Sequence, residues 1–239
     1  MALKSFTLDN RNFEISYDIV NANAKKDIVF LHGWGSNKEV MKSAFSSYLK
    51  DFRHIYLDMS GFGKSQNKYV LTTQDYAKIC EEFLTLIDSS KDIIAGHSFG
   101  GKVATLLNPK NLVLLSSAGI LEKKPLIVKL KIFFAKLLNI FGLKNFTKVF
   151  RSKDVDKMSE NMYATFKNVV NEDFSVYFSN FQNNALIFWG EKDTATSLES
   201  GKKIASLIKN SKFTSYSGDH YFFLKNSKNI SERIENGIS

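Results

Sequence analysis

The sequence predicts an α/β fold in which a mainly parallel sheet is covered by helices on both faces. Short apolar runs of strand length alternate along the chain with stretches of helical periodicity, and this alternation is typical of parallel sheets. The chain has 239 residues, 44% of them hydrophobic, which is enough for one large domain with a sizeable core. Its 21 Phe and 9 Tyr residues exclude a disordered protein.

Eight segments are expected to form the strands. The first two alternate in hydrophobicity and are separated by Asp9-Asn10, which predicts an antiparallel hairpin. Most of the others are short, continuous apolar runs, as expected for strands that are buried on both faces. The predicted strands comprise residues 4–8, 11–20, 27–31, 53–57, 92–95, 111–115, 185–189 and 212–216.

Helices are expected between these strands. The clearest one, over residues 72–88, has a polar start and carries Ile79, Phe83, Leu86 and Ile87 at helical spacing. Further helices are predicted at residues 37–50, 102–107, 198–208 and 224–236.

A long segment without strand character separates the strands predicted at 111–115 and 185–189. It contains Leu126–Phe141, which is apolar almost all round, and a second helical stretch around Met158–Val170. We expect residues 119–184 to form a helical lid over a core built from residues 1–118 and 185–239. The alternative is that these helices merely extend the core.

The most informative motif is a serine in a glycine-rich turn between a predicted strand and a predicted helix. The turn reads Gly96-His97-Ser98-Phe99-Gly100-Gly101. A Gly-x-Ser-x-Gly turn in this setting is a nucleophile elbow, which holds the serine in a strained conformation at the carboxyl edge of a sheet. Its glycines are needed because side chains at positions 96 and 100 would collide with the neighbouring helix and strand.

A serine hydroxyl needs a histidine to accept its proton and a carboxylate to orient that histidine. In this arrangement the chain order is serine, acid, histidine. Asp193 follows a late predicted strand, and His220 lies in the loop after the last one. Glu191 and Asp219 are the rival acids. The sequence therefore predicts Ser98, Asp193 and His220 as a catalytic triad.

Two backbone N–H groups are expected to stabilise the negative oxygen of a tetrahedral intermediate. One belongs to Phe99, the residue after the nucleophile, and the other to Trp34 in the loop His32-Gly33-Trp34-Gly35. Such donors act through the main chain, so the identity of the two side chains does not matter for this role.

The motifs together resemble those of the alpha/beta-hydrolases, in the group of lid-bearing esterases, C–C hydrolases and carrier-protein methyl esterases. They are, in chain order, His32-Gly33-Trp34-Gly35, Asp58 with Gly61-Phe62-Gly63-Lys64-Ser65, Gly96-His97-Ser98-Phe99-Gly100-Gly101, Trp189-Gly190-Glu191-Lys192-Asp193 and Gly218-Asp219-His220. The resemblance implies an eight-stranded, mostly parallel sheet with a helical lid inserted after the sixth strand. The chain departs from the family where proline is common, at Ser60, at Asn184 and after Asp193, which affects loop rigidity. The serine nucleophile separates it from dehalogenases and epoxide hydrolases of the same fold, which carry aspartate there.

The resemblance implies a serine hydrolase that cleaves a small carboxylic ester or acyl substrate through an acyl-enzyme, without a cofactor. Within catalysis, the alternatives are a thioesterase or methyl esterase for an acyl group on a carrier protein, and a C–C bond hydrolase for a ring-cleavage dienoate. Outside catalysis, the alternative is a ligand-binding protein that kept the fold. The motifs do not distinguish the substrates, because substrate selection depends on the lid.

Charge and cysteine content limit the partners. The net charge is +9, and residues 121–157 hold ten basic residues against three acidic ones. This cluster favours an anionic or carrier-bound substrate or an anionic membrane surface, whereas the 29 lysines of the whole chain equally indicate a compositional bias. Nucleic-acid binding is not expected, and the oligomeric state is left open.

Cys80 is the only cysteine, so neither a disulfide nor a cysteine metal cluster forms within the chain. Without an apolar signal-peptide core or membrane span, we expect a cytoplasmic protein.

Overall fold

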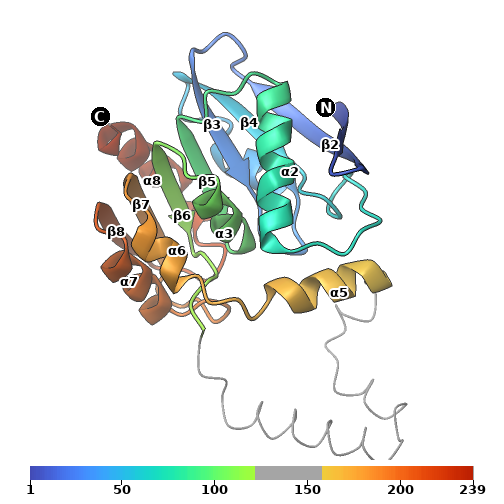
Figure 1. The fold of residues 1–239 in the computed structure, drawn as a ribbon. Helices are drawn as coiled ribbons and strands as arrows, with labels where there is room; N and C mark the ends of the chain where they lie inside the picture. The colour runs from blue at the N-terminus through green and yellow to red at the C-terminus, as the bar shows by residue number, and fades with distance from the viewer. Residues whose placement is uncertain (122–157, 239) are drawn as a thin grey trace, which may run out of the picture.

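The computed structural model describes residues 1–121 and 158–238 (Figure 1). Eight strands form one sheet in the order β1-β2-β4-β3-β5-β6-β7-β8. β1 and β2 are antiparallel, β2 and β4 are antiparallel, and all pairings from β4 to β8 are parallel. The predicted mostly parallel, eight-stranded sheet is confirmed. The strands are β1 (Ala2–Leu8), β2 (Arg11–Val20), β3 (Lys26–Leu31), β4 (Phe52–Leu57), β5 (Ile93–His97), β6 (Asn111–Leu115), β7 (Asn184–Gly190) and β8 (Ser211–Tyr216).

The central strands are largely apolar because each faces a core on both sides. In β3, Ile28 and Phe30 belong to one hydrophobic cluster, and Val29 and Leu31 belong to the cluster on the opposite face. All four side chains are fully buried. Since successive residues of a strand point to opposite faces, a continuous apolar run is what a doubly covered strand requires.

Helices cover both faces of the sheet (Figure 1). On one face, α1 (Lys38–Phe45) packs against α8 (Phe223–Gly237); on the other, α2 (Thr73–Leu86) packs against α3 (Phe99–Leu106), and α7 (Leu198–Leu207) packs against β7 and β8. All five were predicted, although α1 ends five residues earlier and α3 begins three residues earlier than expected.

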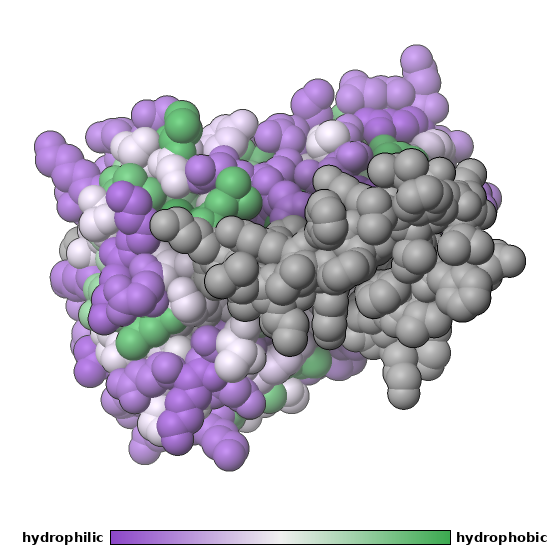
Figure 2. Space-filling model, turned by 90° about the horizontal axis from the view of Figure 1, so that it is seen from below, coloured by the Kyte–Doolittle hydropathy of each residue, from purple (hydrophilic) through white to green (hydrophobic). Residues whose placement is uncertain are grey.

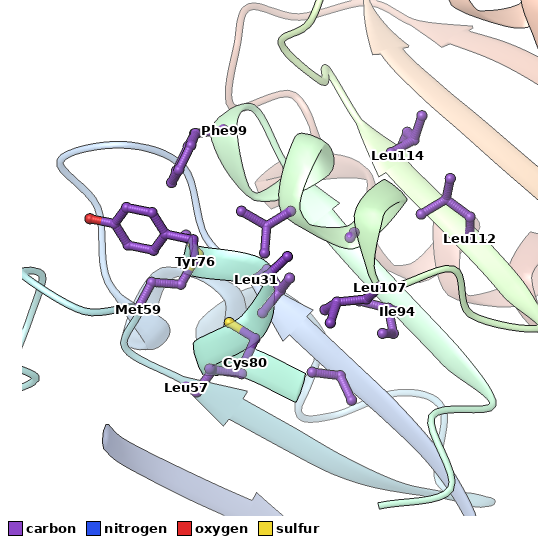
Figure 3. Packing of buried hydrophobic residues seen from close by; sticks show 14 of the residues in the cluster. Leu31, Leu57, Met59, Tyr76, Cys80, Ile94, Phe99, Leu107, Leu112 and Leu114 are labelled. Atoms are coloured by element: carbon purple, nitrogen blue, oxygen red, sulfur yellow. The ribbon is translucent and has the colours of Figure 1, made fainter. Parts of the chain in front are cut away.

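The larger core lies between the sheet and helices α2, α3 and α7. Figure 3 shows part of it, where side chains of α2 and α3 meet those of the strands. Cys80 is buried there, and burial raises the pKa of its thiol to about 12. The thiol therefore stays protonated and acts as a small core side chain.

The chain between β6 and β7 contains α5 (Glu160–Val169) and α6 (Ser175–Asn180). The helix predicted around Met158–Val170 corresponds to α5, whereas α6 was not predicted, and the one predicted at Leu126–Phe141 lies outside the described residues. The ten basic residues counted in the segment 121–157 also lie outside the described residues. The division into a core and a lid at residues 119–184 stays a prediction.

Side-chain hydrogen bonds fix α5 to the loop before α2. Thr165 Oγ1 accepts from the Leu71 N–H at 3.0 Å, and Asn161 Nδ2 donates to the Asn67 carbonyl at 2.9 Å. α5 consequently lies across the end of the sheet where the parallel strands have their carboxyl ends (Figure 1). Figure 2 shows the molecule from this side, where hydrophobic residues form small patches within a largely hydrophilic visible surface.

An ion pair between a buried lysine and a partly buried glutamate joins the same segment to α3. The Lys102 ammonium, only 3% exposed, lies 2.8 Å from Glu172 and also donates to the Val169 carbonyl. Burial lowers the pKa of Lys102, and the adjacent Glu172 carboxylate partly offsets that effect. Because a buried charge without its partner is costly, this pair ties the chain after α5 to the helix that follows the serine turn.

Candidate active site

Ser98 occupies the tight turn between β5 and α3. Its backbone has φ +51° and ψ −115°, which is a strained conformation for a residue other than glycine. The Ser98 N–H donates to the Leu115 carbonyl at 3.1 Å, and the Ser98 carbonyl accepts from Gly101 and Ala118, each at 3.0 Å. The end of β6 therefore holds the turn in place. No hydrogen bond links the Ser98 hydroxyl to another described residue.

The glycines on both sides of Ser98 allow the close approach that the turn needs. A Cβ at Gly96 would lie 2.3 Å from the Gly100 carbonyl oxygen, and one at Gly100 would lie 2.5 Å from the Leu31 carbonyl oxygen. Both distances are far below van der Waals contact, and both obstacles are main-chain atoms. The predicted collisions with helix and strand are thus confirmed.

We expect Gly96→Ala to lower the free energy of unfolding by about 3 kcal/mol, because a rigid main-chain clash exceeds ordinary overpacking. Urea denaturation followed by circular dichroism measures this. Gly35→Ala is the matched control: apart from its chain neighbours, no atom of a described residue lies within 4 Å of its Cβ, although its φ is +72°. That variant should lose about 1 kcal/mol from backbone strain alone. Equal losses in the two variants would contradict the packing argument.

His220 and Asp193 form a direct pair. His220 Nδ1 lies 2.7 Å from Asp193 Oδ2, and Asp193 is 7% exposed. The other carboxylate oxygen accepts from the N–H groups of Ala195 and Thr196 at 2.8 and 2.9 Å. Burial raises the pKa of Asp193, but the hydrogen bonds from His220 and Thr196 outweigh it and hold that pKa at about 2. The ionised carboxylate only accepts, so the proton of a neutral His220 ring lies on Nδ1, and Nε2 can act as a base.

The rival acids have other partners. Glu191 accepts a hydrogen bond from the Ser215 hydroxyl at 3.0 Å, and Asp219 accepts from the Tyr221 N–H at 2.9 Å. Gly190 explains how the Asp193 loop reaches the His220 loop, since a Cβ there would lie 2.2 Å from the Asp219 carbonyl oxygen. Of the three acids considered, the structure brings only Asp193 to the His220 ring.

The loop that carries Trp34 runs directly beside Ser98. A Cβ at Gly33 would lie 3.2 Å from the Ser98 Cβ. The Trp34 ring packs edge-on against Phe99, with centroids 5.5 Å apart, and against Phe62 at 4.8 Å. Phe99 is the first residue of α3, where N–H groups have no partner within the helix. The structure thus places the two predicted oxyanion donors on segments that adjoin Ser98.

Two groups hold this loop in roles that the sequence did not predict. Buried His32 donates from Nδ1 to the Gly33 carbonyl at 2.8 Å and accepts at Nε2 from the Met59 N–H at 3.0 Å. Burial lowers the pKa of His32 to about 4, so the ring stays neutral in this role. The Asp58 carboxylate accepts from the buried Lys38 ammonium at 3.0 Å and from the Lys38 N–H at 2.8 Å. Nothing in the spacing of these residues reveals the pairing.

The remaining histidines are His54 and His97. His54 lies near the start of β4, away from the site, and bonds the Leu49 carbonyl and the Tyr56 hydroxyl. His97 immediately precedes Ser98 and contacts the His220 loop rather than taking the place of the base. Within residues 1–121 and 158–238, no cluster of His, Cys, Asp and Glu has the geometry to hold a metal ion.

The comparison with protein families agrees with this fold. Residues 28–177 match the alpha/beta hydrolase family. The chain belongs to that family. A pimeloyl-[acyl-carrier protein] methyl ester esterase of Proteus mirabilis is 35% identical to this alpha/beta hydrolase over 91 residues, which are 37% of this chain. The aligned part spans only 34% of that esterase's length.

Solved structures show the same architecture over nearly the whole chain. A hydrolase from Pseudomonas aeruginosa has a TM-score of 0.75 at 17% identity and covers 99% of this chain and 98% of its own. An esterase from Exiguobacterium antarcticum has a TM-score of 0.74 at 20% identity, with coverages of 95% and 96%. At these identities the likeness concerns the fold. No helix in the described part of the alpha/beta hydrolase is long and apolar enough to cross a membrane.

Proposed function

We propose that this alpha/beta hydrolase is a serine esterase with Ser98, His220 and Asp193 as its triad. The observation that carries the proposal is the 2.7 Å contact between His220 Nδ1 and the ionised, buried Asp193. This pair leaves His220 Nε2 as the basic atom, in a loop that is hydrogen-bonded to the residue before Ser98. Membership of the alpha/beta hydrolase family and the partial sequence match to a methyl ester esterase support the same conclusion.

The proposed reaction has two halves. In the first, Ser98 Oγ attacks the ester carbonyl carbon while His220 Nε2 takes the hydroxyl proton, and the carbonyl oxygen becomes an oxyanion held by the N–H groups of Trp34 and Phe99. The tetrahedral intermediate collapses, the C–O bond to the alcohol breaks, and His220 gives its proton to the departing alcohol. In the second half, His220 deprotonates a water molecule that attacks the acyl-enzyme, and the acid leaves as Ser98 regains its proton.

A cavity of about 790 Å³ adjoins the proposed oxyanion loop. Its described lining has no charged side chain and consists of Trp34, Gly35, Gly61, Phe62, Met158, Ser159 and Met162. Such a lining suits an uncharged, apolar group of the substrate. We therefore propose esters with an apolar acyl chain of moderate length as substrates.

The direct test is hydrolysis of p-nitrophenyl esters from acetate to dodecanoate by the purified protein. We expect turnover with an optimum at an intermediate chain length. Consumption of a ring-cleavage dienoate without ester turnover would favour the C–C hydrolase instead. A folded protein that binds these compounds but turns over none of them would support the binding-protein alternative.

A second candidate is a methyl esterase for a carrier-bound acyl group, like the Proteus mirabilis relative. It is distinguished by comparing a methyl ester on an acyl carrier protein with the same ester on a short pantetheine analogue. A kcat/KM at least tenfold higher for the carrier-bound ester would favour this candidate. Equal values would favour a small-molecule esterase.

Met162 is expected to limit the length of the acyl chain. It is buried on α5, and its sulfur would lie 2.4 Å from a Cβ at Gly61, so it fills the space against that loop. Met162→Trp should shift the optimum to shorter esters, with kcat/KM for longer ones falling about fourfold per excluded methylene, because each buried methylene contributes about 0.8 kcal/mol. Val170→Trp adds the same ring at a position that is 46% exposed and outside the cavity lining. An unchanged chain-length profile in Met162→Trp would contradict this assignment.

A further inference from the structure

His97 lies where three segments of the proposed site meet. It ends β5 and is bonded covalently to Ser98. Its Nε2 lies 3.0 Å from the main-chain carbonyl oxygen of His220. On its other side, a Cβ at Gly33 would lie 3.0 Å from His97 Nδ1, so the imidazole also touches the loop that leads to Trp34.

The hydrogen bond to His220 fixes the protonation of the His97 ring. A carbonyl oxygen only accepts, so Nε2 must carry the proton and Nδ1 must be unprotonated. Nδ1 is buried and has no hydrogen-bond partner among the residues that the structure describes. Leaving a buried polar atom unpaired costs free energy, which is unexpected if the ring served only to fill the core. A leucine would fill similar space without that cost.

The ring is also packed on the side of the His220 loop. Its centroid lies 4.5 Å from that of the His220 ring, 5.1 Å from that of Tyr221 and 4.9 Å from that of Phe223. His97 is 1% exposed. The ionisable groups around it are His220, Tyr221, Asp193 and His32. Burial, together with the neighbouring His220, lowers the pKa of His97 to about 3, so its ring stays neutral while His220 gains and loses a proton.

We propose that His97 is a positioning residue that fixes the main chain of His220 relative to Ser98. Building on the proposed function, this assigns a role to the residue that occupies the first variable position of the Gly-x-Ser-x-Gly turn. One hydrogen bond joins the nucleophile's neighbour to the carbonyl of the base's own residue, so a short path through the buried His97 ring connects the two proposed reacting residues. A displacement of about 1 Å between such groups can cost about a hundredfold in rate.

The test compares His97→Leu with His97→Gln. Leucine has similar bulk but no donor, whereas the Gln Nε2 can reach the place of the imidazole Nε2–H. We expect His97→Leu to lower kcat for the best p-nitrophenyl ester by about 10- to 100-fold with KM nearly unchanged, and His97→Gln to restore most of it. The His220 Nδ1 proton bonded to Asp193, followed by proton NMR, should exchange faster with water in His97→Leu than in His97→Gln.

His54→Leu is the matched control. It also loses a bond from a buried imidazole Nε2 to a main-chain carbonyl, at 2.9 Å from Leu49, but near the start of β4. This variant should unfold at a lower urea concentration than the wild type, whereas kcat of the folded variant should be unchanged. Equal kcat in His97→Leu and wild type, or equal losses in His97→Leu and His97→Gln, would overturn the proposal. The NMR comparison separates its failure from failure of the esterase proposal, because it measures the His220 loop without any substrate.

Discussion

Replacing Ser98 with alanine should abolish ester hydrolysis, with kcat falling by roughly 10⁴- to 10⁶-fold. The reason is chemical: without Oγ no acyl-enzyme forms, and His220 has no hydroxyl to deprotonate. Residual turnover would reflect only the oxyanion donors and binding of the ester. The measurement is the initial rate with the best p-nitrophenyl ester, together with labelling by a fluorophosphonate, which should modify the wild type and leave Ser98→Ala unlabelled.

The fold of Ser98→Ala should be intact, because the Ser98 hydroxyl bonds no other described residue and the turn is held by main-chain contacts. Its free energy of unfolding should lie within about 0.5 kcal/mol of the wild type, as for surface substitutions. Ser43→Ala on the exposed side of α1 is the matched control and should keep full activity. Undiminished hydrolysis by Ser98→Ala would rule out Ser98 as the nucleophile and with it the proposed mechanism.

The sheet could be predicted from the sequence because burial on both faces leaves a signal within each strand. Continuous apolar runs such as Ile28–Leu31 occur where two cores require them, and the glycine-rich turn marks the end of β5. The ends of helices were predicted less well. α3 starts directly at Phe99 since Ser98 itself makes the sharp change of direction, and α6, with six residues, is too short for periodicity to reveal.

The proposed triad could be read from the order of motifs, since the fold brings the carboxyl ends of β5, β7 and β8 to one edge. The contacts that hold the proposed triad in place could not be predicted from the sequence. Lys38 pairs with Asp58 over twenty residues, and His97 bonds His220 over 123 residues. Such contacts depend on how loops pack in three dimensions, and a single lysine or histidine in a sequence has no periodic pattern. The sequence therefore predicts the proposed reacting groups but not the contacts that hold them.

Asp193→Asn should lower kcat by about 10³- to 10⁴-fold. The asparagine amide can donate to His220 Nδ1, which favours the tautomer with the proton on Nε2 and so leaves no basic nitrogen for the Ser98 proton. It also cannot stabilise the imidazolium that forms when Ser98 attacks. The measurement is the rate with the best ester across pH 5 to 9, and the loss should persist throughout, because the pKa of Asp193 at about 2 keeps the wild-type carboxylate ionised over this range.

The neighbouring acids supply the controls for this prediction. Glu191→Gln and Asp219→Asn each remove one negative charge from the same loops, yet Glu191 bonds Ser215 and Asp219 bonds the Tyr221 N–H. Both variants should keep kcat within about threefold of the wild type, because neither carboxylate orients the ring.

The pKa of Asp193 is lower in the folded protein than its ordinary value of 3.8, so its ionisation stabilises the fold above pH 4, and that stability is lost as pH falls towards 2. Asp193→Asn should therefore flatten the fall in unfolding free energy between pH 4 and pH 2. A larger kcat loss in Glu191→Gln than in Asp193→Asn would assign the third member of the triad to Glu191 instead.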